Sequence, residues 1–229
     1  MKFSFDLINK VLFGWSAKCG CTHVKKIYTF LSSYEKHKIL LESENIDDSL
    51  FDFTQYKIFI VIRNPYDRLV SGFLDKYKTT GQCNAFWNKN TSLTFRNFVN
   101  ELIKGDFKTV EEHHFTPQLS EEWCDSMKNN KQLIVYDICE IDYDKLEKLY
   151  NTKIPFEIRN NKHNENKNRE IIDYPIYDLP LQEYENKKPF TYCFYDHDIR
   201  AKVETFYKYD FDFFKEMGFQ YNIENCQSI

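Results

Sequence analysis

The chain lacks any apolar run long enough to cross a lipid bilayer. A membrane-spanning helix needs about 20 predominantly apolar residues. The N-terminus also lacks the apolar core of a secretory signal peptide, because Asp6, Asn9 and Lys10 interrupt its hydrophobic residues. We therefore predict a cytoplasmic protein that is not stably inserted in a membrane.

The sequence has no excess of basic residues. Its 31 Lys and Arg residues are set against 35 Asp and Glu residues, which gives a formal net charge of −4 at pH 7. General nucleic-acid binders usually carry a basic patch and a positive net charge. The charge balance therefore argues against nucleic acid as a partner.

Cysteine occurs neither in the density of a disulfide scaffold nor in the spacing of a zinc site. The seven cysteines, at positions 19, 21, 83, 124, 139, 193 and 226, are an odd number scattered along the chain. One residue separates Cys19 from Cys21, whereas the redox motif has two, and no second close pair of Cys or His completes a tetrahedral zinc set. We predict reduced thiols and no metal.

The phosphate-binding pattern of ordinary kinases and ATPases, G-x-x-x-x-G-K-[ST], is also absent. No strand-like run ends in an obvious acidic residue for Mg²⁺. Both absences weigh against a magnesium-dependent nucleotide kinase.

Two short segments are the most informative features that are present. Ser16–Thr22 follows the strand-like run Val11–Trp15, and Arg63–Ser71 follows the strand-like run Ile58–Ile62. Each segment lies where the strand-like run passes into a helix-like run. The first N–H groups of a helix have no intrahelical partner and carry partial positive charge, so each junction is a natural anion site. Two such junctions predict a ligand with two phosphate-like groups.

The remaining pattern predicts an α/β protein with a central parallel sheet flanked by helices, in one domain over residues 1–229. Asn64 is suited to an N-cap, Pro65 to the first helical position, and Asp67 to a capping box. The predicted strands are 11–15, 56–62 and 133–136, and the predicted helices are 23–34, 65–77, 95–104, 143–149 and 198–217. Most of the 21 Phe and 16 Tyr residues are expected in the core.

Together, the two segments resemble the nucleotide-binding signatures of sulfotransferases that use 3′-phosphoadenosine 5′-phosphosulfate (PAPS), in particular the chondroitin- and HNK-1-related carbohydrate sulfotransferases of family 2. The signature K-x-G-C-T-x-x-K-[KR] is matched by Lys18, Gly20, Cys21, Thr22, Lys25 and Lys26. The signature R-[ND]-P-[FY]-x-R-L-x-S is matched by Arg63, Asn64, Pro65, Arg68, Leu69 and Ser71. His114–Gln118 resembles an H-[WF]-x-P-Q element, and Phe206–Phe214 resembles a motif near the end of these enzymes.

This resemblance implies a sulfotransferase with a P-loop NTPase-like fold. It would move a sulfuryl group from PAPS to a carbohydrate hydroxyl without a metal, leaving 3′,5′-adenosine bisphosphate. Lys18 would hold the phosphosulfate and neutralise charge on the leaving oxygen, while Arg63 and Ser71 would bind the 3′-phosphate. The donor-binding set it implies is Lys18, Cys19, Gly20, Cys21, Thr22, Lys25, Arg63 and Ser71.

A hydroxyl acceptor needs a general base, and His is the usual group near neutral pH. The resemblance favours His114, with His113 as the second choice. It also relates Lys162–Asn164 to a loop that touches the nucleotide, and animal relatives often carry a Golgi membrane anchor, which is not visible here. Three alternatives stay open: an acceptor that is protein tyrosine or a small alcohol, a non-catalytic nucleotide-binding module, and a nucleotide kinase of related fold. The oligomeric state is not indicated.

Overall fold

The computed structural model describes residues 1–32, 42–43, 53–87, 91–105, 107, 110–128, 130–160 and 169–224. The chain forms two compact units. The first comprises Met1–Arg63 and Gln118–Glu165, and the second comprises Asn64–Pro117 and Asn166–Ile229. Each unit has its own hydrophobic core. The single domain over residues 1–229 stays a prediction.

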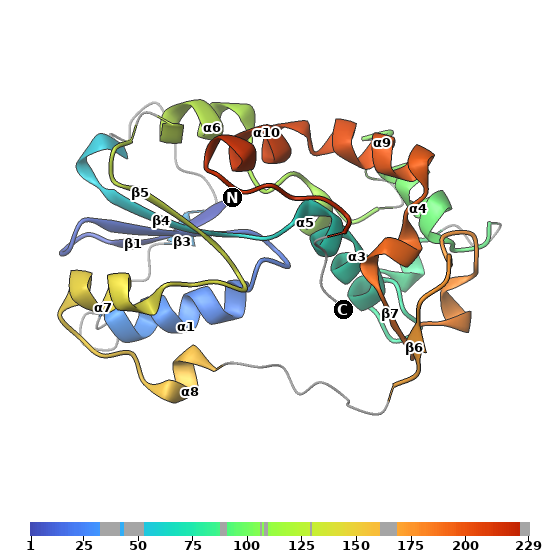
Figure 1. Cartoon of the computed structure of the whole chain (residues 1–229), viewed down its shortest axis with the longest axis horizontal. Coiled ribbons are helices and arrows are strands. Elements are labelled where there is room, and N and C mark those ends of the chain that lie inside the picture. Colours follow the sequence, from blue (N-terminus) through green and yellow to red (C-terminus); the bar gives the residue numbers. More distant parts are fainter. Residues whose placement is uncertain are drawn as a thin grey trace. The chain divides into compact units, whose positions relative to one another are not determined.

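The first unit is built on a sheet with the strand order β3-β1-β2-β4-β5 (Figure 1). Its strands are β1 (Lys2–Asp6), β2 (Val11–Trp15), β3 (Glu42–Ser43), β4 (Lys57–Ile62) and β5 (Leu133–Asp137). Strands β2, β4 and β5 are parallel, which confirms the predicted α/β fold with a central parallel sheet and the three predicted strands. The antiparallel edge formed by β1 and β3 was not predicted.

Helices cover both faces of this sheet, as its apolar strands require. Helices α1 (Cys21–Leu31) and α7 (Tyr143–Tyr150) lie on one face, and α6 (Glu121–Lys128) lies on the other (Figure 1). Phe13 and Phe59 belong to the core cluster beneath α1. On the opposite face, Trp123 of α6 stacks on Phe3 with ring centroids 4.6 Å apart. The short helices α8 (Phe156–Arg159) and η2 (Phe53–Gln55) complete the unit.

The second unit surrounds helix α3 (Pro65–Lys76), and its start agrees with the predicted capping. The side chain of Asn64 accepts a hydrogen bond from the backbone N–H of Tyr66 at 3.1 Å, and Pro65 occupies the first turn. Asp67 lies in the first turn of α3, and its buried carboxylate accepts a hydrogen bond from the hydroxyl of Thr191, so its capping-box role stays a prediction.

Aromatic rings fill the core of the second unit, which confirms the expectation for most Phe and Tyr residues. Phe98 lies 5.0 Å from Phe73 and 4.9 Å from Phe115, measured between ring centroids. A Cβ atom on Gly72 would come within 2.7 Å of Phe115, so this glycine lets α5 approach α3. The other elements are η3 (Asn84–Phe86), α4 (Phe95–Leu102), α5 (Glu112–Phe115), β6 (Ile171–Ile172), η4 (Leu181–Glu183), β7 (Lys188–Pro189) and η5 (Thr191–Phe194).

The long helix predicted over 198–217 is two helices, α9 (His197–Phe206) and α10 (Lys208–Glu216). Tyr207 separates them with φ −99° and ψ 25°. Its ring is buried, and its hydroxyl donates to the carbonyl of Phe115 at 2.6 Å. This long-range hydrogen bond accompanies the break between α9 and α10, which the local periodicity of apolar residues could not predict.

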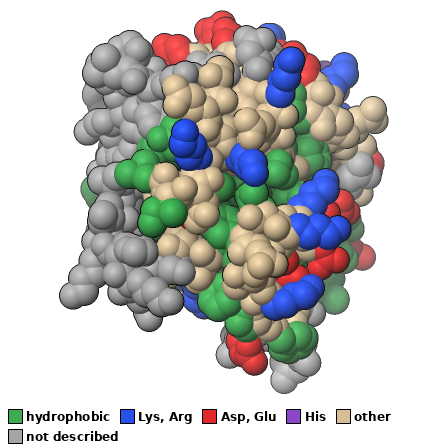
Figure 2. Space-filling model, turned by 90° about the vertical axis from the view of Figure 1, so that its left-hand side faces the viewer, with side chains coloured by type: hydrophobic (Ala, Val, Ile, Leu, Met, Phe, Trp, Pro, Cys, Tyr) green, Lys and Arg blue, Asp and Glu red, His purple; other side chains and the backbone are tan. Residues whose placement is uncertain are grey.

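Six of the seven cysteines lie in the described part of the chain, and all six are free thiols; Cys226 lies outside it. Among the described residues, no three His, Cys, Asp or Glu side chains are grouped as a metal site would require. None of the described helices is both long and apolar enough to cross a membrane. On the face shown in Figure 2, Lys and Arg side chains alternate with acidic, apolar and other groups rather than forming one continuous basic field. The cytoplasmic location and the absence of metal and nucleic-acid partners stay predictions.

Candidate active site

The turn between β2 and α1 presents backbone N–H groups at a helix start. The N–H of Cys19 donates to the carbonyl of Ser16 at 3.1 Å, and Lys18 and Gly20 have φ angles of 65° and 70°. A Cβ atom on Gly20 would lie 2.5 Å from Cδ1 of Ile138, so a side chain would clash there as well as strain the backbone. The sequence therefore needs glycine at this point to begin α1.

The N-terminus of α1 is suited to an anion. No side chain caps it, and its first turn contains no acidic residue. In an 11-residue helix, the partial positive charge and the outward N–H groups of Cys21 and Thr22 are directed at the turn. Thr22 is exposed and Cys21 is half-buried. These features suit an anionic group such as a phosphate or a sulfate.

Arg63, the first residue of the second motif, contacts the turn between β2 and α1. It directly follows β4, and its Nη1 donates to the carbonyl oxygen of Lys18 at 3.1 Å. A guanidinium has five N–H donors, and this is the one hydrogen bond of the Arg63 guanidinium among the described residues. The other donors can therefore meet an anion without breaking the contact to Lys18.

Two residues of the predicted donor-binding set have other contacts. The thiol of Cys19 is buried and donates to Oε1 of Gln118 at 2.9 Å. The ammonium group of Lys25 lies 4.4 Å from the centroid of the Trp15 ring. Direct contact of either side chain with the sulfuryl donor stays a prediction. The hydrogen bond to Gln118 gives Cys19 a part in holding the turn.

The rest of the second motif belongs to the second unit. Ser71 is half-buried on α3. Arg68 is only 2% exposed, and its Nη1 donates to the carbonyl of Thr116 at 2.8 Å. Arg68 thus ties α3 to the segment that follows α5, which gives it a structural role in the motif.

His114 lies in α5 and forms a pair with Glu111. Its Nδ1 is 2.6 Å from Oε2 of Glu111, and the same oxygen accepts the backbone N–H of His114 at 2.9 Å. A proton on Nδ1 leaves Nε2 with a lone pair, the arrangement that a general base requires. Burial lowers the pKa of His114 below its usual 6.5, although the hydrogen bond to Glu111 acts in the opposite direction. Neutral His114 is therefore favoured at pH 7.

Glu111 is held as a carboxylate. Burial alone would raise its pKa, but the hydrogen bonds from His114 and the backbone N–H of His113 outweigh that effect and lower it. The side chain of His113 is exposed, with its ring centroid 4.9 Å from that of His114. Sequence reasoning missed Glu111, although its place three residues before His114 was a usable signal. It also assigned no role to Gln118.

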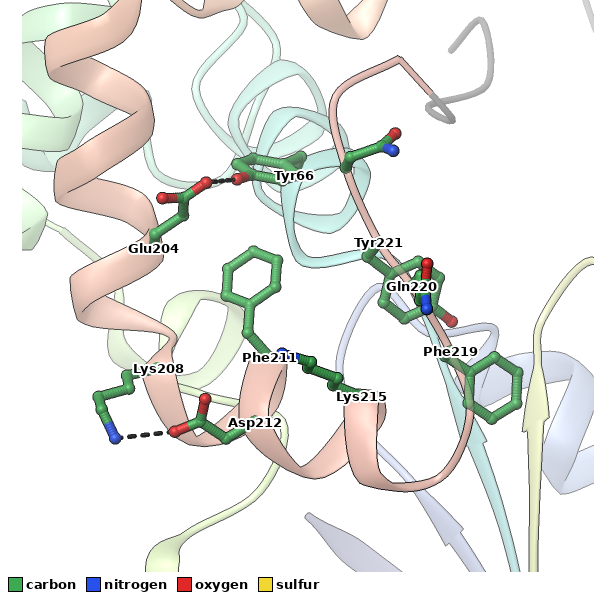
Figure 3. A pocket seen from close by; sticks show the side chains of 10 residues that line it. Tyr66, Glu204, Lys208, Phe211, Asp212, Lys215, Phe219, Gln220 and Tyr221 are labelled. Atoms are coloured by element: carbon green, nitrogen blue, oxygen red, sulfur yellow. Dashed lines mark hydrogen bonds and ion pairs between the residues drawn. The ribbon is translucent and has the colours of Figure 1, made fainter.

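A groove of about 610 Å³ lies in the second unit, between α9, α10 and the segment 219–222 (Figure 3). The rings of Tyr66 and Phe211 line it with centroids 5.1 Å apart. Most of its charges are paired: Glu204 accepts from the hydroxyl of Tyr66, and Lys208 pairs with Asp212 at 2.7 Å (Figure 3). Lys215 also lines the groove, and no carboxylate of the described residues pairs with it. The groove therefore combines aromatic faces with one unpaired cation.

The sequence model of the sulfotransferase family matches residues 3–219. The chain belongs to the sulfotransferase family. This sulfotransferase is an enzyme that transfers a sulfuryl group from a sulfate donor to an acceptor, which agrees with the resemblance drawn from its motifs. No match was found among curated proteins or among solved structures. The segment 162–164, which was compared with a nucleotide-contacting loop, lies outside the described residues.

Proposed function

We propose that this sulfotransferase takes its sulfuryl group from PAPS and delivers it to a hydroxyl group of a carbohydrate. The observation that carries the donor assignment is the contact between the two motifs. The guanidinium of Arg63 lies on the carbonyl of Lys18, beside the uncapped start of α1. One positive region thus combines helix N–H groups with a guanidinium, a combination suited to a ligand with two phosphate-like groups. The family match runs through both units, which supports treating them as one catalytic domain.

In the proposed reaction, Lys18 and the N–H groups of Cys21 and Thr22 hold the phosphosulfate, and Arg63 and Ser71 hold the 3′-phosphate. His114 accepts the acceptor hydroxyl proton at Nε2 as the acceptor oxygen bonds to sulfur. The bond between sulfur and the bridging oxygen breaks, and its electron pair stays on the departing 3′,5′-adenosine bisphosphate. Lys18 neutralises the charge that develops on that oxygen. Glu111 keeps the imidazole oriented and stabilises its protonated form.

The groove of the second unit supports a carbohydrate acceptor. Sugar rings present C–H groups that pack on aromatic faces and hydroxyls that bond to polar side chains. The groove offers both, in Tyr66 and Phe211 and in the amide side chains of Gln220 and Asn222. Tyr207, which precedes α10, donates to the carbonyl of Phe115, the residue after His114. The same unit therefore carries the base and the groove.

The deciding experiment is calorimetric binding of 3′,5′-adenosine bisphosphate beside AMP and ATP, with and without Mg²⁺. A preference for the bisphosphate in the absence of metal is expected. A preference for ATP with Mg²⁺ would contradict the donor assignment. Once the donor is established, sulfuryl transfer to oligosaccharides, a tyrosine peptide and a small alcohol should be compared. Transfer to the peptide or alcohol alone would retain the donor and reject the carbohydrate acceptor.

A further inference from the structure

Four hydrogen bonds of Gln118 converge on the turn between β2 and α1 and on Arg63. Its Oε1 accepts from the thiol of Cys19 at 2.9 Å and from the backbone N–H of Arg63 at 3.0 Å. Its Nε2 donates to the carbonyl of Arg63 at 2.8 Å. Its own carbonyl accepts from the hydroxyl of Ser16 at 3.0 Å. All four residues belong to the first unit.

These bonds fix the two segments whose chemistry the reaction needs. Ser16 and Cys19 are the two ends of the turn that contains Lys18, so Gln118 holds this turn at both ends. The paired bonds to the N–H and carbonyl of Arg63 fix its backbone where β4 ends. The direction in which the Arg63 side chain leaves the strand is thereby set, and its guanidinium reaches Lys18.

Because Gln118 is buried, its hydrogen bonds restrict which residue can occupy this position. The residue has no exposed surface. A buried amide that loses a partner leaves a donor or acceptor unsatisfied, which costs more than the bond itself was worth. Glutamate at this position could not donate to the carbonyl of Arg63, and asparagine is one methylene shorter. The position therefore requires both the length and the two-sided hydrogen bonding of glutamine.

We infer that Gln118 is a positioning residue for sulfuryl transfer: its side chain holds Lys18, the start of α1 and Arg63 in the arrangement that binds the sulfuryl donor. It acts through the thiol of Cys19 and the backbone of Arg63 and does not itself touch the donor. The inference concerns the arrangement of the first unit; the donor-binding roles of Lys18 and Arg63 and the nucleotide used in the test rest on the proposed function.

Gln118→Met tests this role, because methionine keeps the length and much of the volume of glutamine and removes both side-chain hydrogen-bonding groups. The matched control is Asn130→Leu. Asn130 is another buried amide of the first unit, and its Nδ2 donates to the carbonyls of Phe53 at 2.7 Å and Tyr56 at 3.1 Å. Those contacts lie before the start of β4, at the end of the strand away from Arg63.

Two readouts separate positioning from general stability. Gln118→Met should weaken 3′,5′-adenosine bisphosphate binding and lower donor kcat/KM by about 10- to 100-fold, whereas the acceptor KM stays unchanged. It should also speed backbone amide exchange in residues 16–24 and 62–64. Asn130→Leu should lower the melting temperature without either effect. Equal effects of the two variants on donor binding and on exchange in these segments would overturn the inference.

Cys19 supplies a second and milder test. Cys19→Ala removes one donor to Gln118 and should weaken bisphosphate binding by about threefold to tenfold, while Cys19→Ser, which keeps a donor, should restore it. In the Gln118→Met background, Cys19→Ala should have little further effect because the shared bond is already lost. Full additivity of the two changes would contradict the inference. If the wild-type enzyme does not bind the bisphosphate, the proposed donor is wrong and amide exchange still decides the role of Gln118.

Discussion

Nδ1 of His114 lies 2.6 Å from the Glu111 carboxylate, so one nitrogen of the imidazole is committed to an acidic partner. The other nitrogen, Nε2, is then the basic one. His113 is exposed and reaches Glu111 through its backbone N–H. This difference between two adjacent histidines favours His114 as the general base.

Replacing His114 by alanine should lower kcat by about 10²–10⁴-fold, the usual contribution of a general base. Bisphosphate affinity should hardly change, because His114 is assigned no contact with the nucleotide. Steady-state kinetics and calorimetry on the same preparation measure both quantities. His113→Ala is the control and should keep most of the activity. A larger loss in the control than in His114→Ala would move the base to His113.

Replacing Glu111 by glutamine should shift the acidic limb of the kcat/KM profile to lower pH. Burial lowers the pKa of His114, and the hydrogen bond and charge of Glu111 raise it, so loss of the carboxylate lets the pKa fall further. The base must be neutral to act, and a lower pKa keeps it neutral at more acidic pH. The maximal rate should nevertheless drop by about 10- to 100-fold, because the protonated imidazole loses its stabilising partner. An acidic limb that moves to higher pH would contradict the pairing.

Acid should destabilise the fold as the pH falls below about 6.5, the usual histidine pKa. Burial lowers the pKa of His114 and of His23, the latter with a further contribution from Lys26, so the unfolded chain binds more protons in this range. Urea unfolding at about pH 7.5 and about pH 5.5 measures the effect. His114→Gln and His23→Gln should each flatten the pH dependence. An unchanged slope in both variants would exclude these histidines as its source.

Arg63→Ala should weaken binding of 3′,5′-adenosine bisphosphate by about 10- to 100-fold and leave AMP binding much less affected, because AMP lacks the 3′-phosphate. Arg63→Lys should restore little, since an ammonium cannot donate in the planar two-point geometry of a guanidinium. Equal losses for both nucleotides would show that Arg63 binds the 5′-phosphate region instead.

Gly20→Ala should destabilise the protein by about 1–2 kcal/mol or more through its strained backbone and should also weaken bisphosphate binding. Its φ is +70°, and the added Cβ would lie 2.5 Å from Ile138. Gly105→Ala is the matched control, because Gly105 has φ +69° and nothing within 4 Å of an added Cβ. The control should show the backbone cost without loss of bisphosphate affinity, as chemical unfolding and calorimetry can establish.

Phe211→Leu should weaken acceptor binding about twofold to tenfold through loss of an aromatic face, with donor affinity unchanged. Lys215→Gln should weaken binding of an acidic oligosaccharide by up to about fivefold and spare a neutral one. Lys104→Gln removes the same charge from a lysine that pairs with Glu101, and it should have no effect on either acceptor. If Phe211→Leu weakens the bisphosphate instead, the groove belongs to the nucleotide.

Local signals in the sequence correctly predicted much of the fold, and they supplied the candidate residues of the donor site. The apolar runs gave β2, β4 and β5, and Asn64 with Pro65 marked the start of α3, because strand periodicity and helix capping depend on neighbouring residues. The two motifs pointed to a donor with two phosphate-like groups for the same reason. Each is a short strand-to-helix junction whose chemistry is contained in consecutive residues.

Tertiary structure decided how these local pieces are held. Gln118 bonds to Arg63 across 55 residues and to Cys19 across 99, and Tyr207 bonds to Phe115 across 92. No local pattern encodes such pairings, because sheet order and core packing, rather than a shared periodicity, bring the partners together. The sequence alone therefore predicted an anionic donor and the residue types that would bind it. Only the folded chain decided that a buried glutamine fixes their positions, because a hydrogen bond depends on distance in space.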